Sequence, residues 1–182
     1  MQIKNVIRTA VAVALLFPLA SCLDDDKNKD YTEWKEKNET FILEQQYSMK
    51  PDGTYVYERV TADWAADIYV LMKWHNDRSL TEKNLVPLDN STVDVKYQVM
   101  TMDSVIVDSS YAKTDSVYTS QPYKNIPGFW LALTNMHVGD SVTVIIPWRA
   151  AYGSTGSGDI KPYSTLIFDM KLKGIPSYQT PS

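Results

Sequence analysis

Few side chains in this chain could act as nucleophiles, general bases or metal ligands. The 182 residues include two histidines and one cysteine. His75 and His137 lack the spacing of a zinc site, and Cys22 lies ahead of the region expected to fold, so neither a metal site nor a Cys–His pair is expected. We expect His137 to lie solvated in a turn. The sequence thus predicts no metal and no cofactor, which leaves its aromatic residues as the main candidates.

Aromatic residues are abundant, with five Trp, twelve Tyr and four Phe. This is typical of a packed interior, an apolar pocket, or both. Apolar and polar residues alternate over residues 92–100 and again over 166–173, which is the pattern of half-buried strands. The alternation turns Tyr97 and Phe168 toward the core, where most folds would use them only for packing.

Several short motifs lie between residues 97 and 175, in a definite order. They are Tyr97 with Asp108-Ser109-Ser110 eleven residues on, Pro127-Gly128 before a short apolar helix, Met136-x-Val138-Gly139, Ala151-Tyr152-Gly153-x-Thr155-Gly156, and Ser164-Thr165-Leu166-Ile167-Phe168-Asp169. In this order and spacing the chain, over roughly residues 93–175, resembles the FKBP-type peptidyl-prolyl cis/trans isomerases.

The resemblance implies a prolyl pocket with catalytic residues at Tyr97, Asp108, Phe129, Tyr152 and Phe168, and with substrate-binding residues at Val107, Ile126 and Ile160. It further implies that Phe129 forms the floor under the proline ring. The Ile126 amide and the Tyr152 hydroxyl would hold substrate carbonyls, and Asp108 would lie at the rim.

The chemistry of such a pocket needs neither a nucleophile nor a metal. Rotation about an X-Pro bond meets a barrier of roughly 18–20 kcal/mol because amide resonance is lost in the twisted state. A twisted amide has less charge separation than a planar one, so a dry aromatic pocket with a few fixed hydrogen-bond partners favours it.

Some positions depart from the family pattern. Val107 stands where Phe is usual, Phe129 where Trp is usual, and Lys161 where Pro is common, while residues 111–125 lack the usual signature. Two functions therefore remain open: an isomerase weakened by these changes, acting as a folding helper on proline-containing exported polypeptides, or an FKBP-like module that binds a peptide or partner without catalysis.

The N-terminus has the layout of an export signal. Lys4 and Arg8 precede an apolar run that is too short to span a bilayer, and Leu19-Ala20-Ser21-Cys22 follows. This run resembles a bacterial lipobox, in which Cys22 becomes the acylated first residue, and the acidic residues 24–26 resemble a Bacteroidetes export tag. We expect an outer-membrane lipoprotein on the periplasmic or cell-surface face, held to the membrane by its lipid alone. An ordinary secretory signal is the alternative.

Removal of residues 1–21 leaves 16 basic and 22 acidic side chains, a formal charge of about −6, which argues against nucleic acid as a partner. We expect a monomer with four parts: a signal peptide at 1–21, a lipidated cysteine with an acidic tether and spacer helix at 22–50, an FKBP-like domain at 51–176, and a tail at 177–182.

The expected fold class is α+β, an antiparallel sheet curled around one short helix over residues 129–136. Strands are predicted at 54–60 and 67–74 as well as at the alternating segments, with an irregular loop at 75–89. Asp30 and Glu33 could cap a helix that runs to about Met49, with residues 24–30 as a flexible tether ahead of it.

Overall fold

The structure is a computed structural model that describes residues 25–112 and 114–178, and for residues 25–30 only the backbone. Cys22 and the expected signal peptide lie outside the described residues. No helix in the described part of the chain is both long and apolar enough to cross a membrane.

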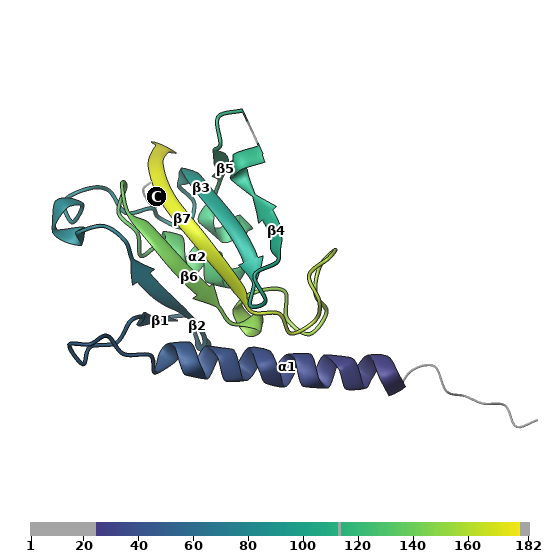
Figure 1. Cartoon of the computed structure of the whole chain (residues 1–182). Helices are drawn as coiled ribbons and strands as arrows, with labels where there is room; N and C mark the ends of the chain where they lie inside the picture. The colour runs from purple at the N-terminus through teal and green to yellow at the C-terminus, as the bar shows by residue number, and fades with distance from the viewer. Residues whose placement is uncertain (1–24, 113, 179–182) are drawn as a thin grey trace, which may run out of the picture.

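The described residues form one antiparallel sheet of seven strands (Figure 1). Its strands are β1 Glu58–Ala62, β2 Ala65–Trp74, β3 Thr92–Thr101, β4 Ile106–Ser109, β5 Tyr118–Ser120, β6 Ser141–Ile146 and β7 Leu166–Ser177. Their order across the sheet is β1-β2-β6-β7-β3-β4, and β5 pairs with the other half of the same edge of β3 that β4 occupies. The predicted α+β class is confirmed.

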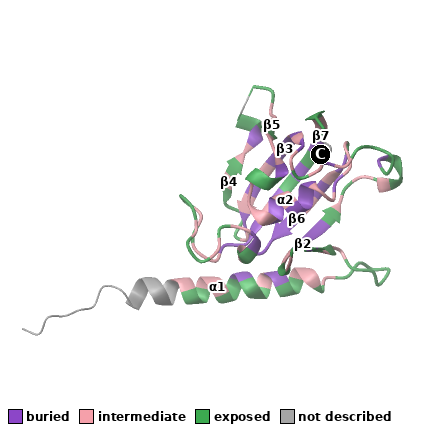
Figure 2. Cartoon of the chain, turned by 180° about the vertical axis from the view of Figure 1, so that it is seen from behind, coloured by how far each residue is buried: buried purple, intermediate pink, exposed green. Residues whose placement is uncertain are grey.

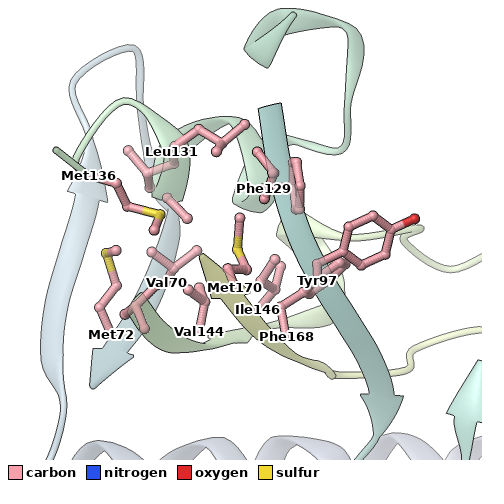
Figure 3. Packing of buried hydrophobic residues seen from close by; sticks show 14 of the residues in the cluster. Val70, Met72, Tyr97, Phe129, Leu131, Met136, Val144, Ile146, Phe168 and Met170 are labelled. Atoms are coloured by element: carbon pink, nitrogen blue, oxygen red, sulfur yellow. The ribbon is translucent and has the colours of Figure 1, made fainter. Parts of the chain in front are cut away.

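The alternating residues of β3 and β7 set the two faces of the sheet. Val93, Val95, Tyr97 and Val99 are buried, while the residues between them are partly exposed. Because β7 pairs with β3 in antiparallel register, with Val99 opposite Phe168, their inward side chains share one apolar face. This face forms the main core cluster (Figure 3).

The short helix α2 (Pro127–Leu133) covers this inner face of the sheet. Pro127 occupies the first turn, where a missing N–H costs nothing. At Gly128, a Cβ atom would lie 2.3 Å from Ile146 Cγ2, so only glycine lets the helix approach β6 this closely. The helix was expected at residues 129–136 and instead begins at Pro127 and ends at Leu133. Its buried residues include Phe129 and Leu131.

The long helix α1 (Asp25–Gln46) lies against the outer face of the sheet (Figure 1). Ile42 packs there with Leu71 of β2 and Ile145 of β6, and Phe41 borders the same cluster. In Figure 2 the buried positions of α1 face the sheet and the exposed ones face solvent. The prediction of a flexible tether over residues 24–30 is wrong from Asp25 onward, because the helix already includes these residues and Asp30 does not begin it.

Turns and four short 3-10 helices connect these elements, namely η1 Arg78–Leu80, η2 Ser110–Ala112, η3 Pro122–Lys124 and η4 Trp148–Ala150. The strand predicted at residues 54–60 begins only at Glu58. Lys50 and Val56 donate backbone hydrogen bonds to Thr54 and Ser48, at 2.7 and 2.9 Å, and so close a turn there instead.

The loop before β3 is held by a buried carboxylate, although its sequence has no apolar periodicity. The Asp140 side chain is fully buried and accepts hydrogen bonds from Thr81 Oγ1 (2.5 Å), the His137 amide (2.8 Å) and Asn76 Nδ2 (3.0 Å). His137 is therefore not a solvated residue, since it is four-fifths buried and lies 2.9 Å from Arg78 Nη2 through Nδ1. Burial raises the pKa of Asp140, but the hydrogen bonds from Thr81, His137 and Asn76 outweigh burial and lower it.

We predict that Asp140→Asn lowers the free energy of unfolding by about 2–3 kcal/mol, because it removes a buried anionic acceptor of several hydrogen bonds. The folded-state pKa of Asp140 lies below that of an unfolded aspartate, about 3.9. The stabilisation is thus present above about pH 4 and is lost as the pH falls through the folded-state pKa. Urea unfolding at pH 7 and pH 3 should give a large difference between parent and variant at pH 7 and a smaller one at pH 3.

The matched control is Asp67→Asn on β2, where the carboxylate is exposed. It should change the free energy of unfolding by less than about 0.5 kcal/mol at either pH. An Asp140→Asn protein as stable as this control at pH 7 would contradict the assigned role.

Candidate functional site

A cavity of about 490 Å³ opens at one end of the core cluster. Its walls come from β3, β4, β5, the N-terminus of α2, the loop between η4 and β7, and β7 itself. The lining residues are Tyr97, Val99, Asp108, Tyr118, Lys124, Asn125, Ile126, Phe129, Tyr152, Ile160, Leu166 and Phe168. All five residues predicted as catalytic, and Ile126 and Ile160, thus surround one cavity.

Aromatic rings form the floor of the cavity. The centroid of the Tyr97 ring lies 5.8 Å from that of Phe129 and 5.9 Å from that of Phe168, and the two Phe rings are 5.2 Å apart. These tilted and edge-to-face arrangements are the ones that aromatic pairs favour. Figure 3 shows the three side chains together at the edge of the core, with the Tyr97 hydroxyl pointing away from it. The floor is thus an extension of the core.

Phe129, and not its neighbour Trp130, provides the floor at the N-terminus of α2. The Trp130 ring instead stacks on Trp64 with centroids 4.3 Å apart, and its Nε1 donates to Asp89 Oδ1 at 2.6 Å. The register inferred from the sequence therefore agrees with the placement of these two residues.

Tyr97 and Asp108 form a hydrogen-bonded pair at the rim. The Tyr97 hydroxyl donates to Asp108 Oδ2 at 2.5 Å, and the Ser109 amide donates to Asp108 Oδ1 at 2.7 Å. The backbone of Tyr97 is held as well, because its amide donates to Ser110 Oγ at 2.9 Å at the point where β3 passes from β5 to β4. A side chain of the Asp-Ser-Ser sequence therefore satisfies the backbone amide of Tyr97 at this edge of the sheet.

Tyr97 and Tyr152 of the site stay neutral over the physiological range. Burial first, and then the hydrogen bond to Asp108, raise the pKa of Tyr97 far above its usual value. Burial and the nearby Asp108 carboxylate also raise the pKa of Tyr152. Both hydroxyls therefore remain protonated and can donate hydrogen bonds.

The backbone amide of Ile126, just before α2, and the hydroxyl of Tyr152 have no acceptor among the described residues. Tyr152 is 38% exposed. Both residues line the cavity. A bound peptide could accept hydrogen bonds from these groups, and we find no competing use for them in the described chain.

Three cavity residues, Tyr118, Lys124 and Asn125, were not predicted from the sequence. The Tyr118 hydroxyl donates to Asn125 Oδ1 at 3.0 Å, and Asn125 Nδ2 donates to the Gln121 carbonyl at 2.8 Å. No periodic pattern in residues 111–125 signals this arrangement. Two further cavity residues, Val99 and Leu166, could have been found, since each lies two residues from a predicted pocket aromatic on the same strand face.

Val107 differs from its prediction as a substrate-binding residue. It is absent from the cavity lining, and its half-buried side chain packs against the main core cluster. The reason is local, because β4 carries an irregularity in its pairing with β3 between Val99 and Met100, which shifts the residues next to Asp108.

The described residues contain no group of three or more His, Cys, Asp or Glu side chains that could hold a metal ion. The site consists of an aromatic floor, a polar rim and two available donors. It is suited to bind an apolar ring with an adjoining amide.

Sequence comparison places these features in a known family. A sequence model of the FKBP-type peptidyl-prolyl cis-trans isomerases matches residues 84–173, which include the strands β3 to β6, α2 and most of β7. The chain is 34% identical to the isomerase FkpA of Escherichia coli K12 over 90 residues, which is 50% of this chain and 33% of FkpA. It is 37% identical over 89 residues to the FKBP-type 22 kDa isomerase of the same strain, covering 48% of this chain and 42% of that protein. The chain thus spans only a third to two fifths of these relatives.

Solved structures share the fold. The crystal structure of a peptidyl-prolyl cis-trans isomerase from Pseudomonas syringae pv. tomato aligns with a TM-score of 0.63 and 27% identity, covering 79% of this chain and 95% of that one. The crystal structure of FkpA from Escherichia coli aligns with a TM-score of 0.59 and 24% identity, covering 86% and 63%, and shows the fold alone. On the family match and the relatives together, the chain belongs to the FKBP-type peptidyl-prolyl cis-trans isomerase family.

Proposed function

We propose that this protein catalyses cis/trans isomerisation of X-Pro bonds in exported polypeptides and so helps them to fold. The observation that carries the proposal is the cavity itself. It combines the aromatic floor of Tyr97, Phe129 and Phe168 with two donors, the Ile126 amide and the Tyr152 hydroxyl, that have no acceptor among the described residues.

The arrangement suits rotation of a prolyl amide. The pyrrolidine ring would lie on the aromatic floor, where burial removes its apolar surface from water. The donors would hold the carbonyls on either side of the rotating bond, so that binding energy favours the twisted geometry. A 10⁴-fold acceleration requires about 5.5 kcal/mol, which desolvation and orientation can supply without covalent chemistry.

Asp108 has an indirect part in this scheme. Its carboxylate accepts a hydrogen bond from the Tyr97 hydroxyl and thereby fixes the Tyr97 ring, which forms part of the floor. After burial, the Asp108 carboxylate is the second cause that raises the pKa of Tyr152, whose hydroxyl stays protonated and available as a donor. Asp108 is exposed, so it contributes to the site more than to the core.

Phe129 favours a slow enzyme over a fast one. Its ring offers less area to a proline than the larger indole that the family commonly has at this position. The second candidate function, a binding module that holds proline-containing peptides without catalysis, follows from the same substitution. The two functions share the cavity and differ only in turnover.

We further propose that the protein is a lipoprotein of the outer membrane, with Cys22 acylated and its folded part in the periplasm or at the cell surface. The support is the Leu19-Ala20-Ser21-Cys22 run after a short apolar segment. We propose that it acts as a monomer and contacts the membrane through its lipid only.

The first test of the function is an isomerisation assay with prolyl tetrapeptides that differ in the residue before proline, using the full-length chain in detergent. We expect acceleration of the uncatalysed exchange, which otherwise takes tens to hundreds of seconds. Fluorescence titration with the same peptides provides the alternative readout. Binding at this cavity without any acceleration would replace the enzyme by the binding module.

The second test is Asp108→Val. We predict a loss of about tenfold in kcat/KM, equivalent to about 1.4 kcal/mol of transition-state binding, because the Tyr97 hydroxyl loses the carboxylate that orients it. The free energy of unfolding should change by less than about 1 kcal/mol, since the side chain is exposed.

Asp169→Val is the matched control for this test, because Asp169 follows the pocket residue Phe168 but points to the outer face of the sheet, where it accepts from Thr143. Its kcat/KM should equal that of the parent. Equal losses in the two variants would remove Asp108 from the mechanism.

The third test concerns the anchor. Cys22→Ser should leave the protein unprocessed or release it from the membrane fraction, because the acyl chains can no longer be attached. Membrane partitioning and mass spectrometry of the processed N-terminus give the answer. If Cys22→Ser protein partitions with membranes in the same processed form as the parent, the lipoprotein proposal is wrong.

A further inference from the structure

Helix α1 contacts the loop that supplies two of the cavity residues, although α1 lies outside the segment matched to the family. We call residues 148–165 the pocket loop. It runs from η4 to the start of β7 and contributes Tyr152 and Ile160 to the cavity. In Figure 1, α1 passes beneath the end of the sheet from which this loop leaves.

The first contact is made by Asn38, which is fully buried in α1. Its Oδ1 accepts the Thr165 amide at 2.7 Å, and its Nδ2 donates to the Trp34 carbonyl at 2.8 Å. Thr165 directly precedes Leu166, which lines the cavity. Asparagine is a poor residue for a helix interior, and burial of its amide is favourable only when its hydrogen bonds are made. Asn38 therefore joins the helix to the loop.

The second contact is made by Trp34. Its Nε1 donates to Ser164 Oγ at 3.1 Å, and Ser164 Oγ in turn donates to the Lys161 carbonyl at 2.7 Å. The Lys161 ammonium lies 5.1 Å from the centroid of the Trp34 ring. Lys161 directly follows the cavity residue Ile160. The indole of Trp34 thus holds the second half of the pocket loop, at Lys161 and Ser164.

The third contact is made by Lys35, whose Nζ lies 5.4 Å from the centroid of the Tyr163 ring and 5.8 Å from that of Trp148. Tyr163 adopts a left-handed backbone with φ of 60°, which is strained for a residue that is not glycine. In that conformation its amide donates to the Gly153 carbonyl at 2.9 Å, next to Tyr152. Ring contacts with α1 offset this strain.

Two of these contacts end one residue from a cavity residue, at Thr165 beside Leu166 and at Lys161 beside Ile160. The third reaches Tyr163, whose amide bonds to the carbonyl of Gly153 beside Tyr152. The tip of the loop is exposed, and Tyr31 of α1 borders a hollow of about 360 Å³ beside it. A loop that must be ordered on binding weakens the complex by the entropy it loses, whereas a loop held in place beforehand does not.

We propose that α1 is a positioning element of the prolyl site, in which Trp34 and Asn38 hold the pocket loop so that Tyr152 and Ile160 face Phe129, and that this sets the KM of the substrate. The proposal depends on the proposed function for its kinetic readout. It gives the N-terminal helix a second part besides packing on the sheet, because the sheet contact uses other residues, Phe41 and Ile42.

The test compares Asn38→Ala and Trp34→Phe with the control Ile42→Ala in the full-length chain. Ile42 is buried against Leu71 and Ile145 on the outer face of the sheet, so its truncation removes a sheet contact of α1 and leaves the Trp34 and Asn38 side chains unchanged. At a temperature where all variants are folded by circular dichroism, we expect KM for a prolyl tetrapeptide to rise about fivefold in both loop-contact variants and kcat to change less than twofold. Ile42→Ala should keep the parent values.

Losses that follow the stability of the variants, with Ile42→Ala affected as strongly as the others, would reduce α1 to a packing element and overturn the proposal. Unchanged KM in both loop-contact variants would overturn it too. Having two loop-contact variants keeps the test decisive if one of them fails to fold.

Hydrogen–deuterium exchange of the segment 150–165 provides a readout that does not require catalysis. Exchange should be faster in Asn38→Ala and Trp34→Phe than in the parent and in Ile42→Ala. If the parent protein shows no isomerase activity, the proposed function is wrong but the positioning role can still be tested. The affinity for a proline-containing peptide then replaces KM as the readout, and we expect it to be about fivefold weaker in the two loop-contact variants. Equal exchange in all four proteins would overturn the positioning role whatever the parent catalyses.

Discussion

The antiparallel pairing of β3 with β7 is the constraint on which the rest of the site depends. It places Val99 opposite Phe168 and Tyr97 opposite Met170, so that both aromatic rings lie on the inner face. A slip of one residue would move every one of these side chains to the outer face. β6 pairs with the other edge of β7, and α2 can then bring Phe129 against Tyr97 and Phe168 only because Gly128 permits close approach to Ile146. The floor of the cavity is therefore a consequence of sheet register.

The core and the site are continuous in this protein, and apolar and polar residues have different roles in them. The aromatic floor is buried and packs with the core cluster, so these residues serve stability and recognition together. The polar groups lie at the rim: the Tyr97–Asp108 pair, the Ile126 amide and the Tyr152 hydroxyl. Apolar packing cannot direct a hydroxyl or a carboxylate, whereas the fixed geometry of hydrogen bonds can. The rim is the part of the site that can be altered without loss of the fold.

Buried polar side chains organise the two long loops that apolar packing leaves undetermined. Asp140 joins the loop before β3 to the turn before β6 through Thr81, Asn76 and the His137 amide. Asn38 joins α1 to the pocket loop through the Thr165 amide. In each case a buried side chain bonds to at least one partner that is distant in sequence, and the cost of leaving these groups unpaired makes the loop position specific.

The sequence by itself determined the strands β3 and β7, the short helix after Pro127-Gly128, and the inward direction of Tyr97 and Phe168, because periods of two and the effects of proline and glycine are local properties. The family resemblance added Phe129 as the floor. Tertiary structure alone decided that Tyr118 and Asn125 join the cavity, that Val107 leaves it for the core, that His137 is largely buried beside Arg78, and that α1 begins by Asp25 and reaches the pocket loop. These features depend on the side-chain contacts of the folded chain, which range from the Tyr118 to Asn125 hydrogen bond to the bond between Asn38 and Thr165, 127 positions apart. No local pattern encodes such contacts, since they exist only once the sheet has brought their segments together.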